Sequence, residues 1–157
     1  VVETEDASDG LTETDVVGVG EEVTSVSEFG NRKFTVLLVE DNIELLNLTR
    51  EALSVWFKVI RAGNGKEALE RFEASAQGEI SVILMDLVMP VMDGFEASRS
   101  IRALEREDAK NVVIVALTAS DYEEDAKKCR LAGMNEHLSK PLDTGNLMRV
   151  IHKYIKF

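Results

Sequence analysis

From Lys33 onward, short apolar runs alternate with stretches in which apolar residues recur at helical spacing, and this alternation is repeated five times. The apolar runs are typical of buried strands, whereas the helical spacing predicts amphipathic helices. Five strand-helix units indicate parallel strands, right-handed crossovers and helices on both faces of one sheet. The predicted strands cover residues 34–39, 58–62, 81–85, 112–117 and 136–138.

The predicted helices begin and end at residues with suitable capping chemistry. Asp93-Gly94 forms a turn that leads into the third helix, and Gly133 is a natural residue just past the end of the fourth. The helical spacing extends to Trp56 in the first helix and to Leu104 in the third. The candidate N-terminal capping residues are Asn42, Asn64 with Glu67, Asp121 with Glu124, and Asp143.

For five such units the usual solution is an α/β, flavodoxin-like (βα)5 fold, a doubly wound five-stranded parallel sheet with strand order 2-1-3-4-5. In that order the strand at 34–39 lies beside the strand at 81–85, where the direction of winding reverses. Open α/β sheets bind ligands at this point, beyond the carboxyl ends of the strands. We therefore expect Asp41 to lie beside Asp86.

The acidity of the chain is concentrated at its beginning. Residues 1–30 contain nine acidic and no basic residues, which leaves 20 acidic and 18 basic residues in the rest. So polar a segment cannot bury enough apolar surface to offset the entropy of ordering it. Residues 1–32 are therefore expected to be a disordered, flexible acidic linker, and residues 33–157 the folded domain. The nearly balanced charge of that domain argues against direct binding of nucleic acid.

The sequence has no apolar stretch long enough for a membrane span and no signal peptide. The only cysteine, Cys129, excludes an internal disulfide and fits a reducing compartment; we expect it at the surface or edge of the fourth helix. The chain begins with Val, which indicates a piece of a longer protein. We expect a cytoplasmic domain, with any membrane anchor of the parent protein outside this chain.

Three carboxylates and a hydroxyl follow predicted strands that are neighbours in the sheet. Glu40 and Asp41 follow the first strand, Asp86 follows the third, and Thr118 follows the fourth. Like charges so close together are costly unless a cation binds or one group is protonated. Hard oxygen ligands without nearby Cys or His favour Mg²⁺. The sequence therefore predicts a magnesium site at this edge of the sheet.

An acidic magnesium site suits phosphoryl chemistry, because the metal neutralises charge on the transferring oxygens. An Asp can itself be the nucleophile and form an aspartyl phosphate. Asp86 is the best candidate, because it is central and precedes a Pro-containing loop. The hydroxyl of Thr118 can donate to one phosphoryl oxygen, and Lys140, at the end of the last strand, can meet another as a point charge.

Four motifs at these strand ends resemble the receiver domain of two-component response regulators and hybrid histidine kinases. The resemblance covers about residues 34 to 157, with the motifs in the family's order, and is greatest to the C-terminal receiver of a hybrid sensor histidine kinase. Any single motif would be weak, but together they are specific. The motifs are Val39-Glu40-Asp41-Asn42, Met85-Asp86-Leu87-Val88-Met89-Pro90-Val91-Met92-Asp93-Gly94, Leu117-Thr118-Ala119 and Ser139-Lys140-Pro141.

The resemblance implies roles for these residues in a phosphorelay. Asp86 would accept phosphate from the phosphohistidine of a sensor histidine kinase or of a histidine phosphotransfer domain. Mg²⁺ would be held by Glu40, Asp41, Asp86 and the backbone carbonyl of Val88. Thr118 and Lys140 would bind the phosphoryl oxygens.

On phosphorylation, Thr118 would move inward and remodel the face formed by the helix before Gly133, the strand at 136–138 and the last helix. A phosphorylation-dependent dimer through that face is compatible with the resemblance.

Two positions depart from the family pattern or bear on its kinetics. The family usually has Tyr or Phe three residues before the Lys, as a rotating switch residue, whereas this chain has His137; an imidazole there could still move or titrate near neutral pH. Val88, two residues after Asp86, cannot orient an attacking water, so we predict slow self-dephosphorylation. A phospho-Asp86 lifetime of only seconds would contradict this hypothesis.

Three alternatives remain open at the level of sequence. A Mg²⁺-dependent aspartyl phosphatase of the haloacid-dehalogenase kind would need a second Asp where Val88 stands. A degenerate receiver that acts only as a docking surface would not need intact Asp86 and Lys140. A stand-alone single-domain response regulator differs from a hybrid kinase fragment only in what surrounds the domain. As a hybrid kinase fragment or as a stand-alone regulator, the isolated domain would capture phosphate without being a turnover enzyme.

Overall fold

The computed structural model describes residues 34–119 and 123–155. The expected acidic linker and the capping pair Asp121-Glu124 lie outside the residues, or the side chains, that are described. Residues Phe34–Lys156 form one compact unit. Its strands are β1 (Thr35–Val39), β2 (Lys58–Ala62), β3 (Ile80–Asp86), β4 (Val113–Thr118) and β5 (Glu136–Ser139). Its helices are α2 (Ile43–Leu53), α3 (Gly65–Ala74), α4 (Gly94–Arg102), α5 (Glu107–Asn111), α6 (Glu123–Leu131) and α7 (Thr144–Tyr154).

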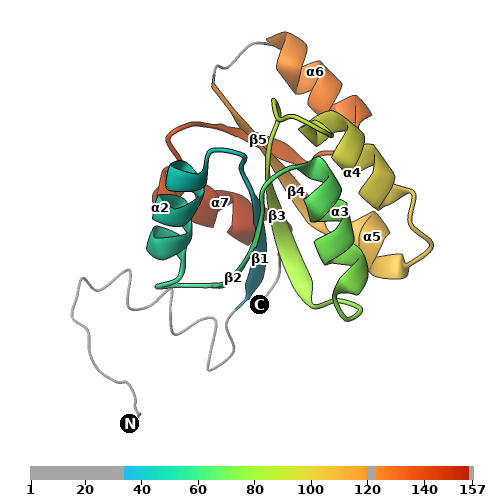
Figure 1. The fold of residues 1–157 in the computed structure, drawn as a ribbon, viewed down its shortest axis with the longest axis horizontal. Coiled ribbons are helices and arrows are strands. Elements are labelled where there is room, and N and C mark those ends of the chain that lie inside the picture. The colour runs from blue at the N-terminus through green and yellow to red at the C-terminus, as the bar shows by residue number, and fades with distance from the viewer. Residues whose placement is uncertain (1–33, 120–122, 156–157) are drawn as a thin grey trace, which may run out of the picture. The chain divides into compact units, whose positions relative to one another are not determined.

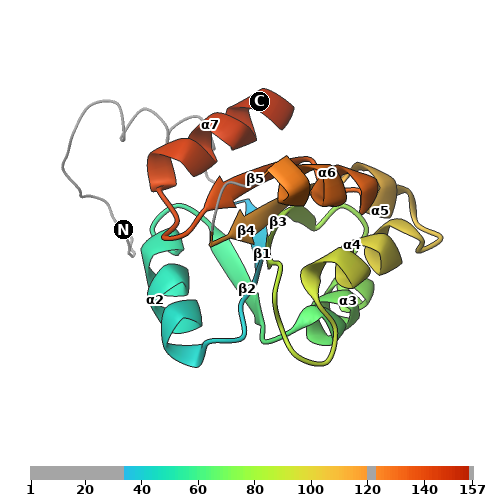
Figure 2. The ribbon, with the colours of Figure 1, turned by 90° about the horizontal axis from the view of Figure 1, so that it is seen from above.

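The five strands form one parallel sheet with the order β2-β1-β3-β4-β5, which confirms the predicted topology. Helices α2 and α7 lie on one face of the sheet, and α3, α4, α5 and α6 lie on the other (Figures 1 and 2). The central strand β3 is covered on both sides, and its residues Val82 to Met85 have no exposed surface. This explains why its sequence is a continuous apolar run and does not alternate with polar residues.

The predicted caps are present wherever the structure describes them. Asn64 Oδ1 accepts a hydrogen bond from the backbone N–H of Glu67 at 2.9 Å, and the Glu67 carboxylate accepts one from Gly63. Gly133 has a φ of +93°, and the N–H of Met134 donates to the carbonyl of Cys129 across it. Helix α6 therefore ends in a Schellman motif, which a glycine favours.

The structure corrects three details of the sequence-based picture. Trp56 and Leu104 lie beyond the ends of α2 and α4, because the apolar spacing continues past the last helical residues, Leu53 and Arg102. The five-residue helix α5 was not predicted, since a segment that short and that charged carries no periodic signal. Cys129 is 3% exposed, not at the surface, and packs in the core with residues of α3 and α4.

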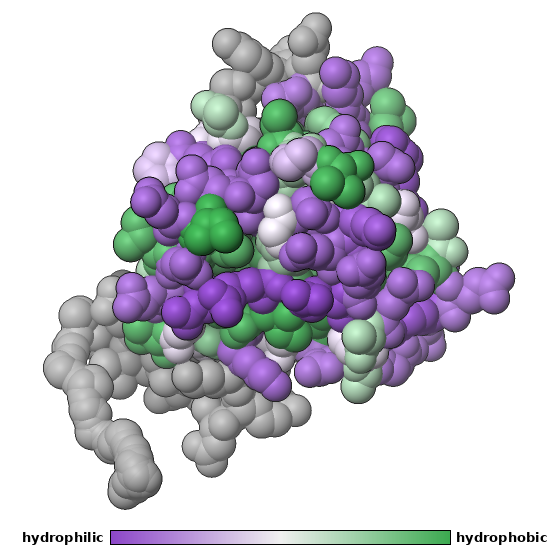
Figure 3. Space-filling view, viewed as in Figure 1, coloured by the Kyte–Doolittle hydropathy of each residue, from purple (hydrophilic) through white to green (hydrophobic). Residues whose placement is uncertain are grey.

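The side of the domain seen in Figure 3 carries hydrophobic residues in small separate groups among hydrophilic ones, as on the surface of most globular domains. No helix in the two described ranges has the length and apolar character that crossing a bilayer would require.

Both ends of the described domain lie at the amino-terminal edge of the sheet. Phe34 immediately precedes β1, and its carbonyl accepts a hydrogen bond from the N–H of Lys58 at the start of β2. The end of α7 lines a hollow together with the first residues of β3 and β4. Tyr154 also donates a hydrogen bond to the carbonyl of Asn135, just before β5.

Candidate functional site

The register of the sheet brings the predicted site residues to its carboxyl-terminal edge. Val39 of β1 pairs with Met85 of β3, so Glu40 and Asp86 come next on adjacent strands. On the other side of β3, Asp86 pairs with Leu117, and the next residue, Thr118, pairs with Ser139 of β5. Because the strands are parallel, residues that are far apart in sequence meet at one place.

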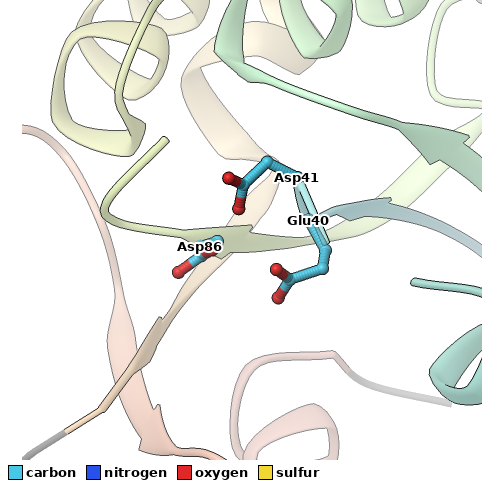
Figure 4. Close-up of side chains that lie close together, drawn as sticks. All are labelled: Glu40, Asp41 and Asp86. Atoms are coloured by element: carbon cyan, nitrogen blue, oxygen red, sulfur yellow. The ribbon is translucent and has the colours of Figure 1, made fainter. Parts of the chain in front are cut away.

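Three carboxylates form a cluster at this edge. Glu40, Asp41 and Asp86 each offer one carboxylate oxygen, and these oxygens all lie within 4.8 Å of one another (Figure 4). Glu40 is 4% exposed and Asp86 is 5% exposed, whereas Asp41 is exposed. The Oε2 of Glu40 accepts a hydrogen bond from the N–H of Asn42 at 3.1 Å, which fixes the start of the loop after β1.

Lys140 places a positive charge against two of these carboxylates. Its Nζ lies 3.1 Å from Oε1 of Glu40 and 3.2 Å from Oδ1 of Asp86. Its backbone N–H donates to the carbonyl of Thr118 at 2.8 Å, which anchors it beside the end of β4. Burial lowers the pKa of Lys140, but its bond to Glu40 and the charge of Asp86 outweigh this and leave the pKa above its ordinary value. Lys140 is therefore a permanent cation of the site.

The carboxyl group of Asp86, the candidate phosphoryl acceptor, has a raised pKa. Burial raises the pKa of Asp86 to about 6, with a further contribution from the Glu40 carboxylate, while Lys140 opposes the shift. A single ammonium is therefore too little to balance this group of carboxylates. The site has the electrostatics of one that gains from an added cation.

The residues fit Mg²⁺. Converging carboxylate oxygens, with no His or Cys among them, are the donor set that this ion prefers. The uncompensated negative charge, visible in the raised pKa of Asp86, is what a divalent cation would neutralise.

These groups line a pocket of about 430 Å³ at the end of the sheet. Thr118 is 2% exposed and closes the strand end, while Val88 is 83% exposed on the loop after β3. Asp125 on α6 also lines the pocket, but the sequence did not predict this. In the sequence, a charged residue within a helix cannot be distinguished from one that faces solvent. The lining residues are Glu40, Asp41, Asp86, Leu87, Val88, Leu117, Thr118, Ala119, Asp125 and Lys140.

His137 lies apart from the pocket. It is partly buried on β5, where it pairs in register with Ala116 of β4, and it is absent from the residues that line the pocket. His137, which precedes Leu138 on β5, is therefore separate from the residues that line the pocket around Asp86.

The loop after Asp86 is shaped by a close backbone approach at Gly94. A Cβ at this position would lie 2.3 Å from the carbonyl oxygen of Asp86, and the N–H of Gly94 donates to the carbonyl of Leu87 at 3.0 Å. Asp93 caps α4 by accepting a hydrogen bond from the N–H of Glu96 at 2.8 Å. The chain can thus return against the peptide of Asp86 only because residue 94 has no side chain.

Residues 36–152 match the family model described as the response regulator receiver domain. The chain belongs to this family. It is a receiver domain of two-component phosphorelay signalling and is homologous to the receivers of hybrid histidine kinases. With the hybrid signal transduction histidine kinase L of Dictyostelium discoideum it shares 37% identity over 123 residues, which is 77% of this chain and 7% of that protein. The chain thus spans a small part of the length of this relative.

Two solved receiver structures resemble the domain closely. The receiver domain of the sensor histidine kinase PA1611 from Pseudomonas aeruginosa has 35% identity and a TM-score of 0.68, over 78% of this chain and 98% of that one. That structure holds a magnesium ion in its active-site cleft. The receiver domain of Saccharomyces cerevisiae Ssk1, crystallised with the phosphotransfer protein Ypd1, has 34% identity and a TM-score of 0.68, over 78% and 88% of the two chains.

Proposed function

We propose that Asp86 accepts a phosphoryl group from the phosphohistidine of a partner protein. An oxygen of Asp86 attacks the phosphorus, a P–O bond forms, and the P–N bond to the imidazole breaks. The observation that carries this proposal is the position of Lys140, whose ammonium contacts both Glu40 and Asp86 in the lining of one pocket. An ammonium in that place orients the attacking carboxylate and keeps most of it ionised near neutral pH.

The remaining pocket residues have complementary roles in this proposal. Glu40, Asp41, Asp86 and the backbone carbonyl of Val88 would hold Mg²⁺, which supplies positive charge to the phosphoryl oxygens. Lys140 and the hydroxyl of Thr118 would bind the other oxygens of the transferred group. The PA1611 receiver, which holds magnesium in its cleft, supports the choice of ion.

The output of the switch is part of the same proposal. Movement of Thr118 toward a bound phosphoryl group would change the face formed by α6, β5 and α7, with His137 in the place of the usual aromatic residue. The backbone bond from Lys140 to the Thr118 carbonyl links β4 to the end of β5 and supports such coupling. A phosphorylation-dependent dimer through this face would be seen as a doubling of mass with beryllofluoride and Mg²⁺.

The partner is proposed to be a histidine phosphotransfer domain or the kinase's own phosphohistidine. The Ssk1 receiver, solved with Ypd1, supports the first kind of partner, and the kinase relatives support a parent protein of the hybrid kinase class. The proposal further takes residues 1–32 as a linker, residues 33–157 as the receiver domain, and the cytoplasm as its location, which the single cysteine favours.

A phosphotransfer assay tests the proposal directly. The chain is mixed with a phosphotransfer domain carrying radiolabelled phosphohistidine, with Mg²⁺ or with a chelator. We expect acid-labile, base-labile label on the chain only with Mg²⁺, and none on Asp86→Asn. The matched control Glu70→Gln removes one exposed carboxylate of α3 and should be labelled as the unmodified chain is. Equal labelling of Asp86→Asn would overturn the assignment.

A further inference from the structure

Among the described residues that line the pocket, Asp125 is the charged one to which the proposed transfer gives no role. It belongs to the first turn of α6 and is partly buried. Of the ten described residues that line the pocket, the acidic cluster and Lys140 serve the metal and the acceptor in the proposed transfer, Thr118 binds oxygen, and four are apolar. Asp125 lines the pocket from α6, one of the elements of the proposed output face.

The charge that Asp125 meets changes when Asp86 is phosphorylated. Free Asp86 carries at most one negative charge and sits beside Lys140. An aspartyl phosphate carries roughly two, and its outer oxygens extend away from the strand end into the pocket. Within the described residues, the ion pairs at this pocket join Lys140 to Glu40 and Asp86, and none of them involves Asp125. Its charge is therefore available to act on the incoming group.

We propose that the carboxylate of Asp125, in the lining of the pocket, repels the phosphoryl group on Asp86. This repulsion destabilises phospho-Asp86 and moves the start of α6 away from the phosphoryl group. This inference rests on the proposed function of Asp86 and adds a positioning residue to it. Repulsion of this kind favours onward transfer to a histidine acceptor over storage of the phosphoryl group. It also gives α6 a direct electrostatic response to phosphorylation, separate from the movement of Thr118.

A simpler role for Asp125 has a different signature. An acidic side chain in the first turn of a helix stabilises that helix through its dipole, by about 0.3–1 kcal/mol. That role would change the stability of the domain when Asp125 is neutralised. It would not change the affinity of the pocket for an anion.

The deciding experiment measures the binding of beryllofluoride, a phosphoryl mimic, in the presence of Mg²⁺, followed by backbone amide signals. We compare the unmodified chain with Asp125→Asn, Asp125→Glu and the control Glu70→Gln. Asp125→Asn should bind beryllofluoride about three- to tenfold more tightly, and the gain should shrink as ionic strength rises. Asp125→Glu and Glu70→Gln should remain within twofold of the unmodified chain.

The lifetime of phospho-Asp86 provides the second readout. After phosphorylation by acetyl phosphate and removal of the donor, Asp125→Asn should retain its label about three- to tenfold longer. A beryllofluoride affinity of Asp125→Asn within twofold of the unmodified chain overturns the inference, whatever happens to thermal stability. If the unmodified chain takes up neither label nor beryllofluoride, the proposed function fails as well. Uptake that is equal in both chains refutes only the role of Asp125.

Discussion

The Nζ of Lys140 lies 3.2 Å from Oδ1 of Asp86 and 3.1 Å from Oε1 of Glu40, so one ammonium is shared between two buried carboxylates. The loops after β1, β3 and β5 are held together by this sharing. It leaves the negative charge of the site only partly balanced, as the pKa of Asp86 shows. Two of the following predictions depend on this imbalance.

Removal of the ammonium should raise the pKa of Asp86 further. Because Lys140 now opposes the effects of burial and of Glu40, Lys140→Gln should move the pKa of Asp86 from about 6 upward by about one unit. The titration is followed by NMR of the Asp86 side-chain carboxyl in metal-free protein. The exposed Lys66→Gln serves as the control. An unchanged midpoint in Lys140→Gln would contradict the electrostatic reading of the site.

The stability of the metal-free domain should depend on the ionisation of Asp86. Its pKa is about 6 when folded and about 3.9 when unfolded, so the folded state binds the proton more tightly. This contribution therefore favours folding at low pH and is lost as pH rises from about 4 to 6, by about 2–3 kcal/mol in total. Asp86→Asn lacks the effect and should be more stable than the unmodified chain at pH 7.

The difference between the two chains is the quantity to measure, by urea unfolding at pH 4.5 and pH 7 in a chelator. Asp108 and Glu136 have lowered pKa values and give slopes of the opposite sign, but they are common to both chains and cancel. A stability difference that does not vary with pH would show that Asp86 is not the titrating group.

Neutralising Asp41 should weaken Mg²⁺ binding more than it changes the fold. Asp41 is exposed, whereas Glu40 and Asp86 are buried, so Asp41→Asn removes a proposed ligand with little effect on packing. We expect Mg²⁺ affinity by calorimetry to fall about tenfold or more, and the thermal stabilisation by a given Mg²⁺ concentration to shrink accordingly. Glu70→Gln should bind Mg²⁺ as the unmodified chain does. Equal affinity in Asp41→Asn would remove Asp41 from the site.

Substitution of Gly94 should disturb the acceptor through its backbone. A Cβ at residue 94 would lie 2.3 Å from the carbonyl oxygen of Asp86, so Gly94→Ala must displace the loop or the strand end. We expect a loss of about 1–3 kcal/mol in the free energy of unfolding, together with reduced phosphoryl uptake. Gly63→Ala is the matched control, because its Cβ would meet only the flexible Glu67 side chain at 3.4 Å. Similar behaviour of the two variants would contradict the predicted strain.

The strands and the main cluster could be predicted from the sequence because they depend on local patterns. The apolar run of β3 ends at Asp86, and that of β4 ends at Thr118, so the chemical residue marks the strand end in each case. The parallel order of the sheet then places these ends together without knowledge of any side-chain contact. This is why Glu40, Asp41 and Asp86 could be grouped before their distances were known.

The sequence did not predict the positions of Asp125 and Cys129, because these depend on which side of α6 faces the sheet. Asp125 and Cys129 are one helical turn apart on α6, and both face inward, one to the pocket and one to the core. Ala132, the residue directly after α6, is likewise buried at 2% exposed. Small residues of this kind give a weak apolar signal, so the spacing could not show which side of the helix meets the sheet.

Phe34 and the end of α7 both lie at the edge of the sheet opposite to Asp86, so neither of these two points borders the pocket. Because these points are remote from the pocket, a change at either of them leaves the contacts of the pocket residues unaltered. Linkers joined at these two points can therefore differ in length or sequence without any change in the residues that line the pocket.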